Sequence, residues 1–277
     1  MIGFCTDSNA QIPATLVERF GVEVVPLSVT VGDTTYREGI DLDADGFYEL
    51  FAGGAPQVAT AAPAPGAFVE AFTRLAERGA DEIVSVHIGS SVSATFNSAR
   101  IAAGMVDVPV RLVDTGTASF AITACLWEAA TAVAAGASVD EAVAAAVNVA
   151  GSITNVFVVQ ALDLPAAGGR LAAGVPSEGI PVLTLAGGQM RPIGAAHDVD
   201  GAAQLMADAV TATAPRVRVG LGIADARAAT MTEALERRLQ EAPEVVELVR
   251  YRIGPSVGAH TGPGAAGAIA WPASSGS

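Results

Sequence analysis

The sequence predicts an α/β protein of two lobes, and two observations carry this prediction. Along the first half, short runs of β-branched residues alternate with segments of helical periodicity, which implies βαβ crossovers and a mainly parallel sheet. After residue 150 the connections become glycine-rich and the pattern is typical of a smaller α+β lobe. We therefore expect an N-terminal α/β domain at residues 1–150 and a C-terminal α+β domain at residues 151–277.

The elements of the first half follow from local signals. Apolar residues at helical spacing after Pro65 predict a helix there, because proline suits a first helical turn. Ser90-Ser91 are expected to cap the next helix. Strands are expected at residues 2–5, 22–31, 82–88 and 110–113, with a helix from about Pro13, a turn at Gly32-Asp33 and two alanine-rich helices after Thr115.

The second half is expected to contain four strands and one helix of clear apolar periodicity. Met231, Leu235 and Leu239 mark that helix, with Glu and Arg on its other faces. The strands are expected near residues 155–162, 181–185, 216–223 and 245–253.

Composition excludes several classes of function. The chain has 277 residues and a formal charge of −14, from 15 basic and 29 acidic residues, which argues against nucleic acid and against anionic membranes as partners. All of the basic residues are arginine, so a P-loop lysine and Schiff-base chemistry are both excluded. We expect no cofactor.

Cysteine usage and hydropathy predict a soluble cytoplasmic protein. Cys5 and Cys125 are too few for a disulfide framework or a cysteine-rich metal site, and we expect both to be small buried side chains. The N-terminus has no charged leader before a long apolar stretch, so no signal peptide is expected. The most apolar window, residues 118–135, contains Glu128 and predicts a buried helix, not integral membrane association.

Three of the expected strands end in small polar residues: Thr6-Asp7-Ser8, Ser90 to Ser93, and Asp114-Thr115. In parallel sheets ligands collect outside the carboxyl ends of the strands, so these residues suit the polar rim of a ligand crevice. Ordinary helix capping is the alternative, and it alone explains about half of such residues. From the sequence, both interpretations stay open.

Residues 254–267, GPSVGAHTGPGAAG, contain two enzyme signatures. Gly254 to Gly258 fits the G-x-S-x-G elbow of serine hydrolases, but an acid should follow later in the chain, and residues 257–277 contain no Asp or Glu. Gly262 to Gly267 fits G-x-G-x-x-G, but that fingerprint requires a βαβ unit and an acidic residue further on. We interpret both signatures as coincidences of composition.

The three histidines, His87, His197 and His260, lack metal-ligand spacing, so no metal site is expected. His87 lies in an apolar strand and is expected to be a satisfied core residue. The glycines around His260 should let backbone approach a ligand and leave N–H groups free to face a carboxylate or phosphate. Arg170, which follows Gly168-Gly169, is either an anion contact or part of a structural ion pair.

Several short segments recur in an order and spacing typical of one family. They are Thr6-Asp7-Ser8, Val25-Pro26-Leu27, Thr60 to Pro63, Ser90 to Thr95, Val113-Asp114-Thr115, Gly168 to Leu171 and His260 to Gly264. By these segments the chain resembles the DegV family of bacterial fatty-acid-binding proteins over nearly its whole length.

The resemblance implies two α/β lobes with one long-chain fatty acid between them, its tail in a buried apolar tunnel. By position, Thr60, Ser93 and His260 would contact the carboxylate, with Arg170 at the mouth or behind the head group. Thr261 and Gly262 complete the expected ligand-binding residues. The resemblance further implies a carrier and not an enzyme, which presents the carboxylate to a separate fatty-acid kinase for conversion to an acyl phosphate.

The sequence departs from the family pattern at three places. Thr60-Ala61-Ala62-Pro63 replaces Thr-Ser-Gln-Pro, Ala94 replaces a glycine, and Ala195-Ala196-His197 stands where relatives often carry a Lys-x-Arg pair. The last departure leaves kinase docking open. Two rival functions also stay open: a small-molecule-transforming enzyme with His260 as general base, near Asp114 or Asp7, and a protein-interaction module.

Overall fold

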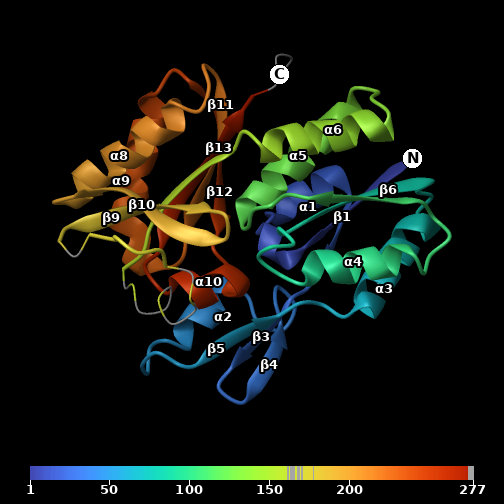
Figure 1. Cartoon of the computed structure of the whole chain (residues 1–277), viewed down its shortest axis with the longest axis horizontal. Coiled ribbons are helices and arrows are strands. Elements are labelled where there is room, and N and C mark those ends of the chain that lie inside the picture. The colour runs from blue at the N-terminus through green and yellow to red at the C-terminus, as the bar shows by residue number, and fades with distance from the viewer. Residues whose placement is uncertain (161, 163–165, 167–168, 170, 177, 274–277) are drawn as a thin grey trace. The chain divides into compact units, whose positions relative to one another are not determined.

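The computed structural model describes residues 1–160, 162, 166, 169, 171–176 and 178–273 (Figure 1). The chain divides into two compact units, which we call the first and second unit. The first comprises Met1–Leu42 and Gln57–Gly151, and the second comprises Asp43–Pro56 and Ser152–Ser277. The segment Asp43–Pro56, which we call the excursion, belongs to the second unit although it precedes residue 150, so a single boundary does not describe it. The domain limits 1–150 and 151–277 stay a prediction.

The first unit is built on a parallel sheet of four strands in the order β2-β1-β6-β7, as the βαβ pattern predicts. Each strand is short and apolar because helices cover both faces of such a sheet. A separate antiparallel sheet has the order β4-β3-β5. The strands are β1 (Ile2–Asp7), β2 (Val22–Val25), β3 (Ser28–Val31), β4 (Thr34–Arg37), β5 (Val58–Ala61), β6 (Glu82–His87) and β7 (Val110–Asp114).

Helices α3 and α4 pack on one face of the parallel sheet, and α5 and α6 pack on the other (Figure 1). Phe68 and Phe72 of α3 meet Cys5 and Ile83 of the sheet in a continuous apolar core. The helices are α1 (Ala14–Phe20), α3 (Pro65–Glu77), α4 (Thr95–Ala103), α5 (Phe120–Ala134) and α6 (Val139–Ala150), with a 3₁₀ turn, η1, at Ser8–Ala10.

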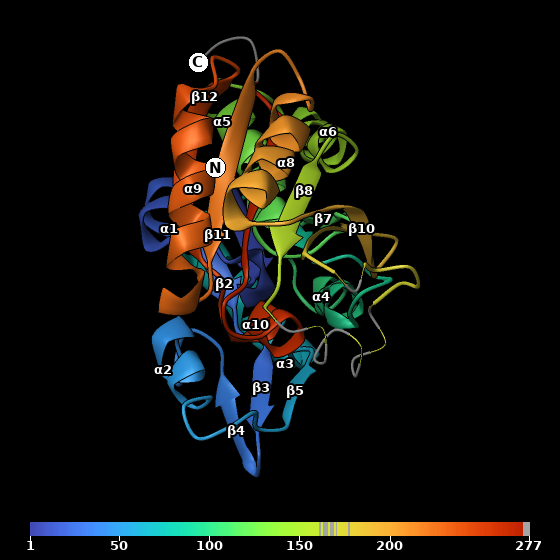
Figure 2. The same cartoon turned by 90° about the vertical axis from the view of Figure 1, so that its left-hand side faces the viewer.

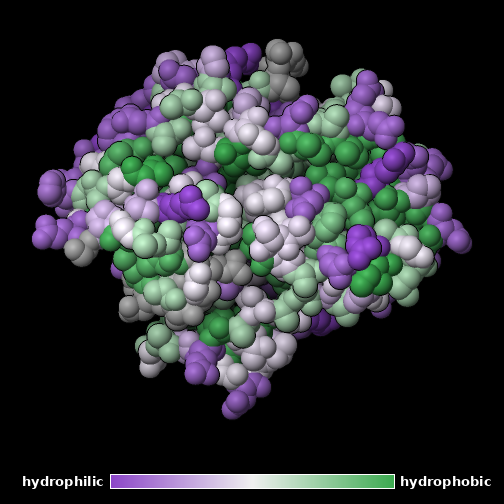
Figure 3. Space-filling view, viewed as in Figure 1, coloured by the Kyte–Doolittle hydropathy of each residue, from purple (hydrophilic) through white to green (hydrophobic). Residues whose placement is uncertain are grey.

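The most apolar window of the sequence forms α5, whose residues from Phe120 to Ala130 are all buried, including Glu128. The buried helix predicted there is therefore confirmed. None of the helices in the described part of the chain combines the length and apolarity that crossing a membrane requires. On the face drawn in Figure 3, part of the apolar colour lies over α5 and α6. Val147 of α6 is 53% exposed.

The second unit contains a mixed sheet of six strands in the order β10-β9-β8-β13-β11-β12. Helices α8 and α9 lie side by side on one face of it (Figure 2). Met206 of α8 and Leu235 of α9 are fully buried there against Val219 of β11. The strands are β8 (Thr154–Val158), β9 (Ile180–Ala186), β10 (Gln189–Ala196), β11 (Val217–Ile223), β12 (Val245–Arg252) and β13 (Ala266–Pro272).

The helices of the second unit are of two kinds. The long ones, α8 (Val199–Thr211) and α9 (Ala229–Glu241), cover the sheet. The short ones are α2 (Ala44–Glu49), α10 (Pro255–Thr261) and the 3₁₀ turn η2 (Ala226–Ala228). Of these, only α9 was expected from the sequence.

Strands β10 and β13 were also not expected, because their sequences are rich in alanine and glycine, which have low β propensity. Strand β13 nevertheless lies inside the sheet, between β8 and β11. A Cβ atom at Gly267 would lie 2.5 Å from the Val156 carbonyl oxygen, so the close approach of β8 requires glycine at this position. Close packing of small residues, and not propensity, therefore determines this strand.

Candidate functional site

The carboxyl ends of β1 and β6 hold a buried polar cluster. His87 lies with Nδ1 2.9 Å from Asp7 Oδ2 and Nε2 2.6 Å from Ser85 Oγ, and all three side chains are fully buried. The Asp7 carboxylate also accepts hydrogen bonds from the backbone N–H groups of Asn9 and Ile88, at 3.1 and 3.2 Å. The prediction that His87 is a satisfied core residue is confirmed.

Neighbouring polar residues of the first unit are also bonded to its backbone. Thr6 Oγ1 donates to the Val86 carbonyl at 2.7 Å, and Thr115 Oγ1 donates to the His87 carbonyl at 2.8 Å. Ser8 Oγ accepts from the Leu27 N–H at 2.9 Å. Of these residues, Asp7 caps η1, as the capping interpretation expects, whereas Thr6, Ser8 and Thr115 are hydrogen-bonded to the backbone of other segments of the first unit.

Ser93 lies in a tightly bonded loop between β6 and α4. The Val92 and Ser93 N–H groups donate to the Gly89 carbonyl at 2.8 and 3.0 Å. The Ser93 hydroxyl lies 2.9 Å from Thr95 Oγ1 and accepts from the Thr95 N–H at 3.3 Å. The side chain is half-buried, so the loop fixes a hydroxyl close to the surface.

The expected cap of α4 by Ser90-Ser91 is wrong. The helix begins at Thr95, its N-cap residue is Ala94, and that residue makes no side-chain cap. Ser90 instead donates its N–H to Asp114 Oδ1 at 3.0 Å, and Gly116 donates to the same oxygen at 3.1 Å. Partial burial acts to raise the pKa of Asp114, but the hydrogen bonds from Ser90 and Gly116 outweigh it and hold that pKa below the ordinary value.

Thr60 lies on the edge strand β5, where it pairs with Val29 of β3. Its side chain is half-buried. Within the described part of the chain the hydroxyl has no hydrogen-bond partner, unlike the hydroxyls of Thr6 and Thr115. Thr60 therefore offers a donor that the fold itself does not use.

His260 lies in the last turn of α10, in the second unit, and its side chain is half-buried. Pro255 occupies the first turn of the helix, and Gly262, with φ of 73°, ends it. The neighbouring Thr261 is buried, and its hydroxyl donates to the Val257 carbonyl at 3.2 Å. The Thr261 side chain therefore bonds within its own helix.

The expectation that the glycines around His260 leave free N–H groups is wrong for the three positions that can be followed. Gly258 donates its N–H to the Gly254 carbonyl and Gly262 donates to the Gly258 carbonyl, each at 2.8 Å. Gly264 donates to Asp225 Oδ1 at 3.0 Å. The chain around His260 forms a helix and a bonded turn, so these N–H groups are not available to an anion.

The structure also explains why the two enzyme signatures of this segment mislead. The G-x-G-x-x-G run, Gly262 to Gly267, joins helix α10 to strand β13, whereas the dinucleotide fingerprint joins a strand to a helix. Ser256 does follow a strand and begins a helix, but it is 3% exposed. A hydrolase elbow presents its serine to solvent, so neither enzyme interpretation is supported.

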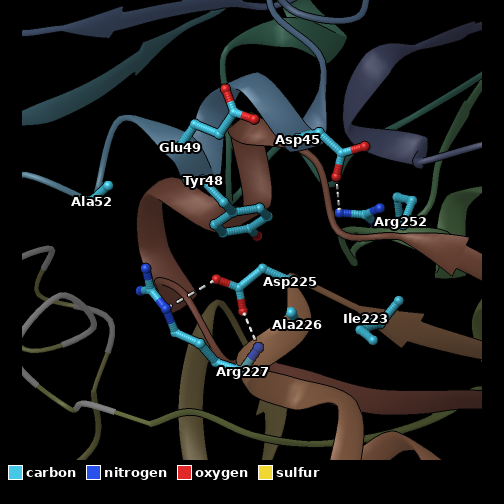
Figure 4. A pocket seen from close by; sticks show the side chains of 9 residues that line it. All are labelled: Asp45, Tyr48, Glu49, Ala52, Ile223, Asp225, Ala226, Arg227 and Arg252. Atoms are coloured by element: carbon cyan, nitrogen blue, oxygen red, sulfur yellow. Dashed lines mark hydrogen bonds and ion pairs between the residues drawn. The ribbon is translucent and has the colours of Figure 1, made fainter.

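A pocket of about 620 Å³ opens between α2 and the carboxyl ends of β11 and β12, within the second unit (Figure 4). Four of its five charged residues form two ion pairs. Arg252 donates to Asp45 Oδ1 at 2.6 Å, and Arg227 Nε lies 3.4 Å from Asp225 Oδ2. None of the predicted ligand residues that the structure describes lines this pocket.

The remaining predictions concern metals, cysteines and Arg170. Among the described residues there is no group of three or more His, Cys, Asp or Glu side chains that suits a metal ion. Cys5 and Cys125 are buried as expected, and burial raises the pKa of each thiol to about 12. Arg170 lies outside the described residues.

Sequence reasoning missed the residues that hold the His260 segment, namely Phe47 and Tyr48 of α2, and Asp225. A signal for α2 was present: Asp43 caps the helix by accepting from the Gly46 N–H at 2.8 Å, and aromatic residues follow at helical spacing. The contact of α2 with the chain at α10 joins positions some 200 residues apart, as does the hydrogen bond from Tyr48 to Ile253 just before that helix. No local pattern predicts such a pairing.

A parallel four-stranded sheet followed by a mixed six-stranded sheet defines a two-unit α/β protein. The DegV family model, described as an uncharacterised protein family, matches residues 1–273, and the chain belongs to this family. The DegV domain-containing protein SCO2569 of Streptomyces coelicolor is 35% identical to it over 274 residues, which cover 97% of each chain.

Two solved structures share the fold. A DegV family protein from Thermus thermophilus, described by its fatty acid binding, matches with a TM-score of 0.87 and 28% identity, over 98% of this chain and 99% of the other. DegV from Bacillus subtilis, described as a fatty acid binding protein, matches with a TM-score of 0.86 and 25% identity over the same shares. The predicted fold class is thereby confirmed.

Proposed function

We propose that this protein binds one long-chain fatty acid and carries it without transforming it. The observation that supports this most is the match of nearly the whole chain to two DegV structures described as fatty acid binding. The enzyme signatures of the sequence, by contrast, occur in the wrong structural order or on a buried serine.

Three side chains are proposed to hold the carboxylate: Thr60, Ser93 and His260. A carboxylate away from water is costly unless it is hydrogen-bonded or paired. Two hydroxyl donors and a protonated imidazole offset that cost, because hydrogen bonds to charged groups are the strong ones. The half-buried hydroxyl of Thr60, which has no partner among the described residues, and the fixed hydroxyl of Ser93 support this assignment.

Arg170, Thr261 and Gly262 complete the proposed ligand-binding residues on the strength of the family resemblance. The Thr261 hydroxyl bonds to Val257 and the Gly262 N–H to Gly258, so these two residues are proposed to contribute by shaping the turn after His260 and not by donating those groups to the ligand. Gly262 has a φ of 73° in the turn after His260, a backbone conformation that other residues rarely adopt.

The acyl tail supplies most of the affinity in this proposal. Removing about fourteen methylenes from water contributes about 10 kcal/mol at ~0.8 kcal/mol each, before the costs of association. The chain is 51% hydrophobic but only 5% aromatic, so its apolar side chains are mostly small and branched. Such side chains suit the walls of a narrow tunnel.

We further propose that the bound carboxylate is presented to a separate fatty-acid kinase, as the family resemblance implies, and that the protein acts in the cytoplasm, where such a kinase finds its nucleotide. The segment that departs from the family pattern, Ala195-Ala196-His197, lies at the end of the edge strand β10. Kinase docking, if it uses this edge, must proceed here without a Lys-x-Arg pair.

The first experiment identifies the ligand. The protein is purified from a bacterial host without delipidation and analysed by native mass spectrometry, and the bound mass is identified after organic extraction. We expect one fatty acid per chain. Ligand-free protein that also shows no heat of binding with long-chain fatty acids in calorimetry would contradict the proposal.

The second experiment tests the anchor. In delipidated protein, Thr60→Ala, Ser93→Ala and His260→Ala should each weaken fatty acid binding about tenfold or more, because each removes a hydrogen bond to a charged group. Calorimetric titration measures the change. Ser91→Ala, in the same loop as Ser93, and His197→Ala are matched controls at exposed positions and should bind as wild type does. Unchanged affinity in all three anchor variants would overturn the assignment.

A further inference from the structure

Helix α10 is too short to hold His260 in place by itself. It has seven residues, and isolated helices of that length are unstable in water. Gly258, near its middle, weakens it further, because glycine has more backbone freedom to lose than any other residue. Contacts with the rest of the second unit must therefore determine where the last turn of α10 lies.

Helix α2 provides one of these contacts. Phe47 is fully buried and Tyr48 is 4% exposed, and their rings meet edge to face with centroids 5.1 Å apart. A Cβ atom on residue 258 would lie 2.7 Å from Phe47 Cε1 and 2.7 Å from Tyr48 Oη. Both distances are shorter than any ordinary carbon contact, so α10 lies against these two rings at a separation that only glycine permits.

A hydrogen bond holds the Tyr48 ring in place. Tyr48 Oη donates to the Ile253 carbonyl at 2.9 Å, and the bond is buried. Ile253 is itself tied to the sheet, since its N–H donates to the Ile223 carbonyl at 2.9 Å. The same tyrosine therefore fixes the chain just before α10 and contacts the middle of the helix.

The chain just after α10 is fixed as well. Asp225, at the end of β11, accepts the Gly264 N–H at 3.0 Å. A Cβ atom at Gly264 would lie 2.6 Å from the Gln160 side-chain amide carbon, and the φ of 77° at this position also favours glycine. Figure 4 shows the Tyr48 ring and the Asp225 carboxylate lining the same pocket from its two sides, so both anchors lie in one region of the second unit.

We propose that Tyr48 and Gly258 are positioning residues for His260. The excursion Asp43–Pro56 brings α2 against α10 and thereby determines the orientation of the imidazole, although α2 lies more than 200 positions earlier in the chain. This inference rests on the proposed function, because it takes His260 to be a contact of the fatty acid carboxylate.

The binding test uses two variants of different severity. Gly258→Ala places a methyl group against Phe47 and Tyr48 and should weaken binding of a C16 fatty acid about tenfold or more. Tyr48→Phe keeps the ring but removes the hydrogen bond to Ile253, and should weaken it about fivefold. Because both act through one contact, the double variant should weaken binding less than the product of the two single effects.

The second readout reports on His260 directly. The protein has only three histidines, so the imidazole signals in ¹H–¹⁵N spectra can be assigned by His→Ala substitution. In Gly258→Ala and Tyr48→Phe, the signals of His260 should shift while those of His87 and His197 stay in place. A general loss of stability would not select one histidine, and unshifted His260 signals in both variants would overturn the inference.

The matched control is Gly53→Ala, which adds a methyl group to the same excursion at a position with no atom within 4 Å of the new Cβ. It should change neither affinity nor the histidine spectrum. Wild-type affinity in Gly258→Ala and Tyr48→Phe, with weakened binding in His260→Ala, would overturn the positioning role and leave the proposed function intact. Wild-type affinity in His260→Ala would instead remove His260 from the carboxylate anchor, while the spectra still decide whether α2 orients His260.

Discussion

The chain segments that carry His87 and His260 are held in place by different kinds of contact. His87, on β6 of the first unit, is held by side chains, since its two ring nitrogens lie within hydrogen-bond distance of Asp7 and Ser85. The segment of His260, in the second unit, is held by side chains from distant parts of the chain, since Tyr48 and Asp225 hydrogen-bond to its backbone and the Phe47 and Tyr48 rings lie against Gly258, where a Cβ atom would be 2.7 Å away.

The difference shows that residues shared with a family need not contact its ligand. Thr6-Asp7-Ser8 is part of the DegV resemblance, yet Asp7 and Thr6 are fully buried and bonded within the first unit. Their position at the carboxyl end of a parallel strand first suggests a ligand rim. Burial and hydrogen bonding, once known, assign them to holding strands β1 and β6 together.

The largest loss of stability is expected when the buried cluster of Asp7, Ser85 and His87 is broken. Asp7→Ala removes the acceptor of the Asn9 and Ile88 N–H groups and the partner of His87, all in the interior. It should lower the free energy of unfolding by about 3 kcal/mol or more, because buried polar groups that lose their partners keep their desolvation cost. Urea unfolding followed by circular dichroism measures the loss.

Asp33→Ala, in an exposed turn of the same unit, is the control and should change the free energy of unfolding by less than about 0.5 kcal/mol. A similar small loss in Asp7→Ala would mean that the cluster around His87 does not stabilise the fold, and the contrast with the His260 segment would disappear.

A smaller loss of stability is expected when a side chain is added at Gly89, where two backbone segments of the first unit lie close together. A Cβ atom at Gly89 would lie 2.7 Å from the carbonyl carbon of Gly116, and backbone cannot move aside as a side chain can. Gly89→Ala should lower the free energy of unfolding by about 2 kcal/mol, as overpacking typically does. The same urea titration applies.

Gly66→Ala is the matched substitution, in helix α3 with no atom within 4 Å of the new Cβ, and should raise stability slightly because alanine favours a helix. Equal stability of the two variants would show that the chain near Gly116 adapts, so that close approach in this fold would be less demanding than the distances imply.

The fold was more predictable than the contacts that hold the candidate site. Strands β1, β6 and β7 were predicted from short apolar runs, because burial on both faces leaves a strong local signal. Strand β13 was not, because its alanines and glycines suit close packing against β8 and carry no β signal of their own.

The candidate site was also predicted only in part. His260 was singled out by the glycines around it, but those glycines were interpreted as a source of free N–H groups, whereas Gly258 and Gly264 make room for neighbouring elements. What they make room for, Tyr48 and Gln160, comes from distant parts of the chain. A local sequence pattern shows that space is needed and not which residue fills it.

The smallest loss of stability is expected at Asp114, which, like Asp7, accepts hydrogen bonds from two backbone N–H groups but lies at an exposed position. Its carboxylate accepts from the Ser90 and Gly116 N–H groups and ties the loop of Ser93 to the end of β7. Asp114→Ala should lower the free energy of unfolding by about 1 kcal/mol at pH 7, as the loss of a capping carboxylate does. Urea titrations of both proteins between pH 7 and pH 3 measure the difference.

The sign of the pH dependence follows from the pKa of Asp114, which its hydrogen bonds hold below the ordinary value in the folded protein. A carboxyl group with a lowered pKa stabilises the fold above its unfolded pKa of about 3.9, and loses that effect as the pH falls through the folded value. Wild type and Asp114→Ala should therefore converge in stability on acidification. A difference that is constant from pH 7 to pH 3 would show that the aspartate acts without its charge, and would leave the buried cluster around His87 as the part of this sheet edge where a carboxylate matters.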